Sequence, residues 1–393
     1  MNYNFSDRVK NLKPSAIREI FKYAADPEVV SFSAGNPSSL AFPAEEIAQI
    51  SNKILNNSPV DALQYSLTEG YTPLRNFLKT YLNDTHKIGR DFDDLIVTTG
   101  AQQVIDLFTK VMCNEGDVVV CENPSFVGAL NCFRSHSTIP VGVDIDDDGI
   151  NLESLEQTLK NNKNAKFIYT IPNFQNPSGI TMSLEKRKAV YELAKKYNVL
   201  ILEDNPYGDL RFEGDYIPTI KSLDTDGIVV YVGSFSKVLS PGMRVGYVCA
   251  DSNIIKKMVV CKQTNDVHTN IWAQLVAFDF ISNYDFNAHL DKLRKIYLDK
   301  MTLTEKTFNE FLAPKGISYI KPQGGLFIWC KLPDYVNMMD YCKKAVLEKV
   351  CVVPGTAFLA DENQISHHFR INFSAPSDDD IVKGFEILSN VDF

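Results

Sequence analysis

Short apolar runs alternate with amphipathic stretches between about residues 95 and 250, and this order limits the possible folds more than any other feature of the chain. Such short apolar runs are typical of buried strands, whereas a stretch such as Leu184–Tyr197 is typical of a helix. Strand, helix and strand in this order require a mostly parallel sheet that helices cover on both faces. The apolar runs are Leu95–Thr98, Val118–Cys121, Ile139–Val143, Lys166–Ile171, Val199–Glu203, Ile228–Val232 and Arg244–Ala250. The sequence therefore predicts an α/β fold with a mostly parallel, seven-stranded sheet.

The pattern changes at about His289, which indicates a second domain. A long charged helical stretch runs from there to Phe311 and is followed by shorter strands. These strands are Ile317–Ile320, Leu326–Lys331, Val350–Val353 and Phe369–Phe373. A chain of 393 residues is long enough for two cores. We therefore expect a large domain over residues 46–288 and a small α+β domain over residues 289–393. Residues 1–45 form an arm that packs with the small domain, with a helix from Ser15 to about Ala25.

Composition excludes several classes of protein. The net charge of −9 opposes nucleic-acid binding, which needs clustered Lys and Arg. No apolar run is long enough to cross a bilayer, and the first residues lack the apolar segment of a signal peptide. The eight cysteines are scattered, which suits reduced thiols in the cytoplasm. The adjacent His367 and His368 would point to opposite faces of a strand, so we expect no metal site.

The strongest chemical signal is the segment Ser234-Phe235-Ser236-Lys237, which follows an apolar run and precedes Arg244. Hydroxyl groups and an arginine suit a phosphate group, and a lysine beside them can condense with an aldehyde. Pyridoxal 5'-phosphate (PLP) needs both of these: groups that hold its phosphate, and an amine that reaches its aldehyde carbon. A solvated lysine beside turn serines is the alternative, and it is the commoner case for a short segment taken alone.

Two further segments offer partners for the pyridine ring of such a cofactor. Asp204 closes the apolar run Val199–Glu203, and a carboxylate there can stabilise a protonated ring nitrogen. Tyr207 and Asn176 can each donate a hydrogen bond to the phenolate oxygen of the ring. The alternative for Asp204 is a helix cap or turn residue, and Asn176 lies in a good turn sequence, Asn-Pro-Ser-Gly.

Three other positions carry weaker signals. Gly100 separates a strand from a helix that would start at Ala101 and Gln102, and the free N–H groups of a helix start suit a phosphate. Phe126 can stack on a pyridine ring or belong to the core. Arg370 lies within an apolar strand, where a buried arginine needs a partner. That partner is either a substrate carboxylate or a structural Asp or Glu.

Together these segments resemble the class I/II aminotransferases, which are PLP-dependent enzymes of fold type I. The resemblance runs from about Ser15 to Ser374. Within the family the match is best with the branch that contains 2-aminoadipate and kynurenine aminotransferases. The segments Ser15–Ile20, Ser31–Pro37 and Gln64–Tyr71 carry this closer match. The sequence departs from the branch at Phe126, where tyrosine is usual, and at Ala101, where serine is common.

The resemblance implies a role for each candidate residue. Lys237 binds the aldehyde carbon of the cofactor and later moves a substrate proton, Asp204 pairs with the ring nitrogen, and Asn176 and Tyr207 bind the phenolate oxygen. The phosphate ligands are Ala101, Gln102, Ser234, Ser236 and Arg244, with Tyr65 supplied by the partner subunit of a homodimer. The substrate α-carboxylate is held by Gly35, Asn176 and Arg370, and Arg18 can meet a side-chain carboxylate of glutamate or 2-aminoadipate.

The function that the resemblance favours is amino transfer between an L-amino acid and 2-oxoglutarate. The amino acid would be of the aromatic, branched or 2-aminoadipate type. Another PLP reaction, such as that of a β-lyase or a decarboxylase, is an alternative, because a fold does not fix a reaction. A non-catalytic, effector-sensing module is a third hypothesis, which the presence of Lys237, Asp204 and Arg370 disfavours.

Overall fold

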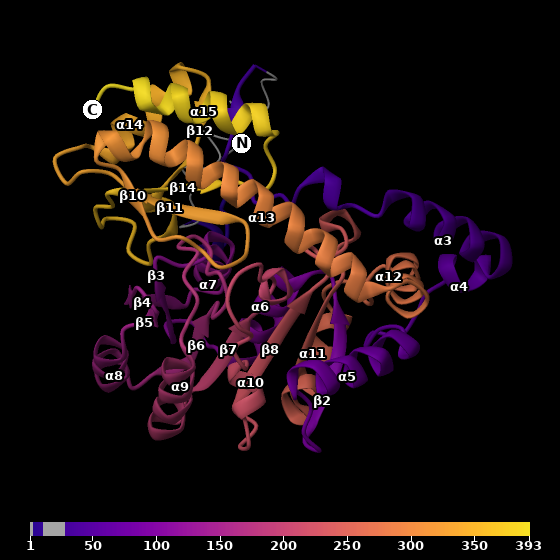
Figure 1. The fold of residues 1–393 in the computed structure, drawn as a ribbon. Helices are drawn as coiled ribbons and strands as arrows, with labels where there is room; N and C mark the ends of the chain where they lie inside the picture. The colour runs from indigo at the N-terminus through magenta and orange to yellow at the C-terminus, as the bar shows by residue number, and fades with distance from the viewer. Residues whose placement is uncertain (1–2, 11–27) are drawn as a thin grey trace.

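The computed structural model describes residues 3–10 and 28–393, and its largest element is an eight-stranded sheet (Figure 1). In spatial order the strands are β2 (Asp93–Thr98), β9 (Gly246–Asp251), β8 (Val229–Ser234), β7 (Leu200–Asp204), β6 (Ala165–Thr170), β3 (Val118–Asn123), β4 (Ile139–Asp146) and β5 (Gly149–Ile150). From β8 to β4 neighbouring strands are parallel. β9 runs antiparallel to both of its neighbours. The predicted α/β class is confirmed. The prediction of seven strands missed β5, because a strand of two residues is too short to show a periodic pattern in the sequence.

Helices cover both faces of this sheet because its strand residues alternate between two cores. Val120, Ile168 and Ile201 lie in one core, together with residues of α8 (Leu152–Asn161), α9 (Leu184–Tyr197) and α10 (Ile220–Leu223). Cys121, Tyr169 and Leu202, each one residue further along its strand, lie in the other core. That second core includes α6 (Ala101–Met112) and α7 (Val127–Ser135), and α11 (Ser252–Gln263) packs against α6.

The predicted helix Leu184–Tyr197 has the bounds of α9, and its two ends show why. Ser183 accepts a hydrogen bond from the backbone N–H of Lys186, which caps the first turn. Asn198 adopts the left-handed conformation at φ 53°, which ends the helix. Beside the large sheet, α5 (Thr72–His86) packs against β2, and α12 (Ile271–Asn283) packs against α5, α3 (Ala44–Asn57) and α4 (Pro59–Leu63).

A second, four-stranded sheet has the strand order β10 (Ser318–Tyr319), β11 (Phe327–Lys331), β14 (His368–Asn372) and β13 (Val353–Pro354). The long helix α13 (Phe286–Phe311) extends from the region of this sheet toward α12 and the large sheet (Figure 1). The helices α14 (Met338–Leu347) and α15 (Asp378–Asn390) complete this half of the molecule. All strands of the second sheet are antiparallel to their neighbours.

The expected strand Val350–Val353 is instead two strands in two different sheets. β12 (Val350–Cys351) pairs with β1 (Val30–Ser31), whereas β13 pairs with β14. The short helix α1 (Asp7–Lys10) precedes the part of the chain that is not described. The expected helix from Ser15 to Ala25 lies outside the described residues. Within residues 3–10 and 28–393, no helix combines the length and apolarity that a membrane span requires.

The parallel strands bring their carboxyl ends to one edge of the large sheet, where ligands bind in folds of this kind. Asn123 ends β3, Asp204 ends β7 and Ser234 ends β8, while Asn176 follows β6. Four polar side chains that are far apart in the sequence are therefore placed near a common edge.

Candidate active site

A cavity of about 340 Å³ lies at this edge of the large sheet. Its lining includes twelve of the residues that the sequence singled out: Gly35, Ala101, Gln102, Phe126, Asn176, Asp204, Tyr207, Ser234, Ser236, Lys237, Arg244 and Arg370. The chain thus brings together residues from the eight-stranded sheet, from the four-stranded sheet and from the segment that follows β1. Of the predicted site residues, Tyr65 does not line this cavity, and Arg18 lies outside the described residues.

Lys237 lies just after β8, and its Nζ donates a hydrogen bond to the carbonyl oxygen of Gly35 at 2.7 Å. Burial, together with the positive charges of Arg370 and Arg244, lowers the pKa of this lysine to about 8. At a pH slightly above neutrality, Lys237 is therefore a neutral amine in a substantial fraction of the protein molecules. A neutral amine is the form that attacks an aldehyde.

One end of the cavity is built to hold an anion. The Nη1 of Arg244 donates to the Oγ of Ser236 at 3.3 Å, and the backbone N–H of Ser236 donates to the Oγ of Ser234 at 3.1 Å. The helix α6 begins opposite them at Ala101, so the N–H groups of its first residues have no partner within the helix. An arginine, two hydroxyl groups and a helix N-terminus therefore converge on one place.

Gly100 allows this convergence. It has a φ of 74°, and a Cβ atom on it would lie 2.1 Å from the Nη2 of Arg244. Gly246 has a related role, since its Cβ would lie 2.7 Å from the carbonyl carbon of Gly100. Arg244 itself is left-handed at φ 54°, so β9 begins at Gly246 and the expected strand Arg244–Ala250 starts two residues too early. The left-handed turn at Arg244 thus delays the start of β9 and directs the Arg244 guanidinium toward Gly100.

Asp204 is a buried carboxylate with one oxygen in use and one free. Its Oδ2 accepts a hydrogen bond from the hydroxyl of Tyr169 at 2.8 Å. Its Oδ1 is buried and has no hydrogen-bond partner among the described residues. Burial raises the pKa of Asp204 to about 7, and the hydrogen bond from Tyr169 opposes that rise. A cationic N–H group in the cavity would satisfy the free oxygen and favour the charged carboxylate.

Arg370 is buried in β14 and is held from several sides. Its Nη1 donates to the Oδ1 of Asn176 at 2.9 Å, and its Nη2 donates to the carbonyl oxygen of Ser33 at 2.6 Å. Its guanidinium lies 4.3 Å from the ring centre of Phe327 and 5.1 Å from that of Phe358. Burial lowers its pKa to about 10, which leaves it charged at neutral pH. The Nε atom is buried without a partner among the described residues.

The structural alternative for Arg370 was a buried Asp or Glu partner. Within the described part of the chain, no carboxylate forms an ion pair with it. The buried charge is instead compensated by an amide oxygen, a carbonyl oxygen and two aromatic faces. A carboxylate that entered the cavity would be its first anionic partner among these groups.

Phe126 and Gln102 line the cavity side by side. A Cβ atom on Gly128 would lie 2.5 Å from the Cζ of Phe126 and 2.7 Å from the Oε1 of Gln102, so this glycine makes room for both. The side-chain amide of Gln102 donates to the carbonyl oxygen of Gly128 at 2.9 Å. Its backbone N–H, and not its side chain, is thus the group that α6 presents at its first turn.

Tyr65 lies on the surface with 81% of its area exposed, and its ring meets the ring of His268 edge to face at 5.8 Å. Val60, Leu63 and Leu67, which lie within a few residues of it, are also exposed. The segment from 60 to 67 therefore presents a mostly apolar surface outside the cavity of its own chain.

Sequence reasoning missed three polar residues that support the site. Tyr169 bonds Asp204, and the Nδ2 of Asn372 donates to the carbonyl oxygens of Ala34 at 2.6 Å and of Asn36 at 3.0 Å, which holds the loop around Gly35. Glu122 is buried at the end of β3 and accepts a hydrogen bond from Thr170 at 2.6 Å. Glu122 closes an apolar run just as Asp204 does, and this repeated pattern was the available signal.

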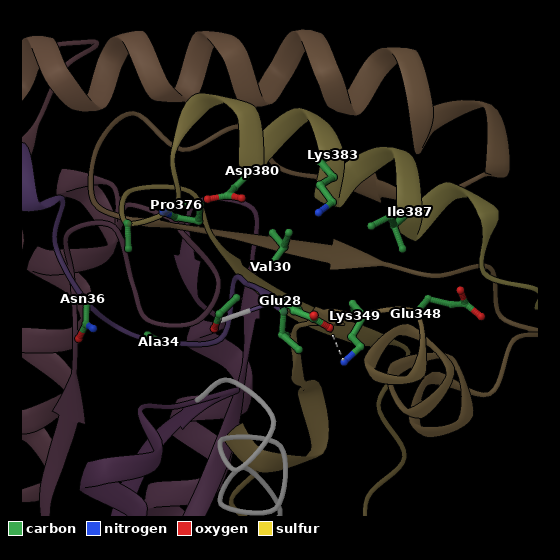
Figure 2. Close-up of a pocket in the computed structure, with 13 residues that line it drawn as sticks. Glu28, Val30, Ala34, Asn36, Glu348, Lys349, Pro376, Asp380, Lys383 and Ile387 are labelled. Carbon is green, nitrogen blue, oxygen red and sulfur yellow. Dashed lines mark ion pairs between the residues drawn. The ribbon is translucent and has the colours of Figure 1, made fainter. Parts of the chain in front are cut away.

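A larger hollow, of about 760 Å³, lies elsewhere, beside β1, β12 and α15 (Figure 2). Its charged side chains carry both signs, and the close-up marks the ion pair between Glu28 and Lys349 at 3.4 Å. Asp380 and Lys383 of α15 point toward the same hollow. Among the described residues that line this hollow there is no arginine, and none of them forms an anion-binding group like the one around Arg244.

The comparison with known families agrees with this geometry. The family model for aminotransferase class I and II matches residues 27–388, and the chain belongs to this family. The aromatic-amino-acid aminotransferase 1 of Thermococcus litoralis is 36% identical over 98% of this chain and 93% of its own length. The 2-aminoadipate transaminase of Thermus thermophilus is 34% identical over 98% of this chain and 95% of its own length.

A solved structure of Pyrococcus horikoshii kynurenine aminotransferase, in complex with PMP, is similar throughout. It has a TM-score of 0.94 and 36% identity, over 98% of this chain and 96% of that chain. The fold is that of the fold-type I PLP enzymes. The free Oδ1 of Asp204, the free Nε of Arg370 and the anion cradle fit such a cofactor and a substrate carboxylate. The protein is a PLP-dependent aminotransferase.

Proposed function

We propose that the protein transfers the amino group of an L-amino acid to 2-oxoglutarate, and that the donor is of the aromatic, branched or 2-aminoadipate type. The observation that carries this proposal is the convergence of Lys237, Asp204 and Arg370 on one cavity, with partnerless polar atoms on two of them. The aromatic and 2-aminoadipate relatives support the donor classes.

Each end of the cavity suits one part of the cofactor. When bound, PLP draws electron density away from the bonds at the substrate Cα. We assign the free Oδ1 of Asp204 to the ring nitrogen, and Asn176 and Tyr207 to the phenolate oxygen. Phe126 covers the ring face. The phosphate is assigned to the N–H groups of Ala101 and Gln102, to the hydroxyls of Ser234 and Ser236, and to Arg244.

Lys237 is the proposed proton carrier. Its Nζ would hold the cofactor at the aldehyde carbon before the reaction, and the same amine would carry the proton that leaves the substrate Cα. A pKa of about 8 suits this work, because the amine then gives and accepts a proton at nearly equal cost near neutral pH. Its contact with the Gly35 carbonyl keeps the amine in the cavity.

Arg370, Asn176 and Gly35 are proposed to hold the α-carboxylate, which every donor and every 2-oxo acid shares. Among the described lining residues the cations are Lys237, Arg244 and Arg370, and each of them already has a task in this scheme. A side-chain carboxylate of glutamate therefore needs another cation. We propose Arg18, which lies outside the described residues.

We further propose a cytoplasmic homodimer. The exposed apolar segment around Tyr65 supports this, because a partner subunit would cover Val60, Leu63 and Leu67. Tyr65 would then reach the phosphate cradle of the partner. For the domains we propose the boundaries 1–45, 46–288 and 289–393. The pairing of β1 with β12 supports the packing of the first segment with the last.

A donor panel tests the reaction. The purified protein, loaded with PLP, is mixed with single amino acids while the absorbance of the cofactor is followed, and 2-oxoglutarate is then added. The proposal predicts that the initial spectrum is lost with aromatic, branched or 2-aminoadipate donors and regained with 2-oxoglutarate, with glutamate formed. Release of pyruvate and ammonia from a β-substituted amino acid would indicate a β-lyase, and release of CO₂ a decarboxylase.

A further inference from the structure

We propose that Tyr169 is a positioning residue for the cofactor, which acts through Asp204: its hydroxyl decides which carboxylate oxygen faces the ring nitrogen and keeps that carboxylate charged. This inference rests on the proposed pairing of Asp204 with the ring nitrogen. Tyr169 does not line the cavity, so its effect on the cofactor must pass through the carboxylate.

The geometry of the pair is fixed by the sheet. Tyr169 in β6 stands opposite Leu202 in β7, and Asp204 follows two residues later on the same side of the sheet. The phenol hydroxyl reaches the Oδ2 of Asp204 at 2.8 Å, and both side chains are buried. The rotation of the carboxylate is thereby set, because one oxygen is tied to the hydroxyl. The other oxygen, Oδ1, keeps no partner among the described residues.

The hydroxyl of Tyr169 is not needed to fill space. Its ring packs edge to face against Phe133 at 5.5 Å, and Phe108 and Phe167 belong to the same core. A phenylalanine would occupy the same volume as the tyrosine ring. A buried hydroxyl group is unfavourable unless it is hydrogen-bonded, and the bond that this one makes is to Asp204. The role of the hydroxyl is therefore its hydrogen bond to the carboxylate of Asp204.

The surroundings of Asp204 explain why its carboxylate needs the hydrogen bond from Tyr169. Asp204 is buried, which favours its neutral form, and a neutral carboxyl group cannot hold a proton on a pyridine nitrogen. Burial raises the pKa of a second acid, Glu122, and the charge of nearby Asp204 acts in the same direction. Tyr169 stays protonated, because burial and the charge of Asp204 hold its pKa well above the ordinary value. It is thus a permanent donor that favours the charged form of Asp204.

The test compares Tyr169→Phe with Tyr341→Phe. Tyr341 of α14 is also buried and does not line the cavity, and its hydroxyl donates to the carbonyl oxygen of Leu388 in α15 at 2.9 Å. Both variants lose one buried tyrosine hydroxyl and its hydrogen bond. A thermal scan first shows that both are folded. Each protein is then loaded with PLP labelled with ¹⁵N in the ring, or with an analogue that has carbon in place of the ring nitrogen.

The ¹⁵N resonance reports directly whether the ring nitrogen carries a proton. We expect a protonated nitrogen in the wild type and in Tyr341→Phe, and a partly deprotonated one in Tyr169→Phe. We also expect the affinity of Tyr169→Phe for PLP to fall by roughly tenfold or more, as for the loss of a hydrogen bond to a charged group. Its affinity for the carbon analogue should stay unchanged.

Two results would overturn the inference alone. An unchanged ¹⁵N signal in Tyr169→Phe, or an equal loss of affinity for both cofactors, would show that the tyrosine is merely structural. A wild-type protein whose ring nitrogen is unprotonated, and which binds both cofactors equally well, would refute the proposed role of Asp204 and this inference with it. The wild-type measurement therefore separates the two failures.

Discussion

Arg370→Lys is the substitution that examines most directly how the cavity recognises its substrates. A lysine keeps the positive charge at the same position of β14 but replaces a planar group with a single ammonium. The guanidinium of Arg370 already gives one N–H to Asn176 and one to the Ser33 carbonyl. Of its five N–H groups three therefore remain, the partnerless Nε among them, and these can bind a carboxylate with two parallel bonds.

The magnitude follows from counting donors. An ammonium has three N–H groups, and two of them would be needed to keep the contacts to Asn176 and Ser33, so one remains for the substrate. The substitution thus removes one charge-assisted hydrogen bond, which contributes about 1.5–3 kcal/mol. At about 1.4 kcal/mol for each factor of ten, kcat/KM should fall by roughly 10- to 150-fold.

The assay is steady-state transamination with several amino donors and with 2-oxoglutarate, together with a measurement of PLP affinity. Because all of these substrates carry the same α-carboxylate, the loss should be similar for each, and PLP affinity should not change. Arg211→Lys is the matched control, since Arg211 also lies over an aromatic ring, that of Phe174 at 4.9 Å, and does not line the cavity. A loss confined to one donor, or an equal loss in the control, would refute the reasoning.

Four further outcomes are expected. Lys237→Ala should still bind PLP, but borohydride should no longer fix the cofactor to the chain, as read by mass spectrometry; a pyridoxyl group on another lysine would contradict the assignment. In the cofactor-free protein the raised pKa of Asp204, about 7 against an ordinary 3.8, means that the carboxyl lowers stability progressively as pH rises from about 4 to 7. Asp204→Asn should therefore raise the Tm measured by calorimetry at pH 8 but not at pH 4. Equal shifts of Tm at both pH values would contradict this expectation. Mixed dimers of Tyr65→Ala and Lys237→Ala should regain activity that neither parent has, because one of their two sites is intact; no gain on mixing would argue against shared sites. Arg18→Ala should lower kcat/KM for glutamate and 2-oxoglutarate by roughly 10- to 100-fold more than for an uncharged donor, and equal effects would show that acid recognition lies elsewhere.

The large sheet was predictable because its strands are long and apolar. All seven long strands lie within three residues of the runs read from the sequence. Most of them are buried, and a strand buried on both faces needs apolar residues at nearly every position. The small strands were harder. Val350–Val353 has the composition of one strand, yet Val350 pairs with Val30 and Val353 pairs with Arg370, in different sheets. The pairing partners decide where the run divides, and they lie outside the run: Val30 is in the first tenth of the chain, and Arg370 is in the strand that follows.

Most of the site residues that sequence reasoning found lie where one element gives way to another, and Arg370, in the middle of β14, is an exception. Lys237, Asp204 and Gly100 all follow or close an apolar run. Tyr169 lies inside such a run and has the composition of a core residue. Its hydroxyl gains a meaning only from Asp204, which is 35 positions further along the chain. Residues that act through another residue are thus the ones that a linear pattern hides.

The three acids that end apolar strands show what limits such predictions. Glu203 and Asp204 are adjacent, and strand geometry sends them to opposite faces of the sheet. Glu203 accepts the backbone N–H groups of Ile220 and Lys221 at 2.8 and 2.7 Å, and so caps α10, while Asp204 lines the cavity. Glu122 bonds Thr170, the neighbour of Tyr169 on the other face of β6. The expected strand ended at Glu203, whereas β7 ends at Asp204, so the residue that caps α10 and the proposed cofactor ligand are direct neighbours in the chain. To assign such a pair from sequence, one must know which face of the sheet each residue of the strand points to. The neighbouring strands fix that orientation, and the apolar run itself does not.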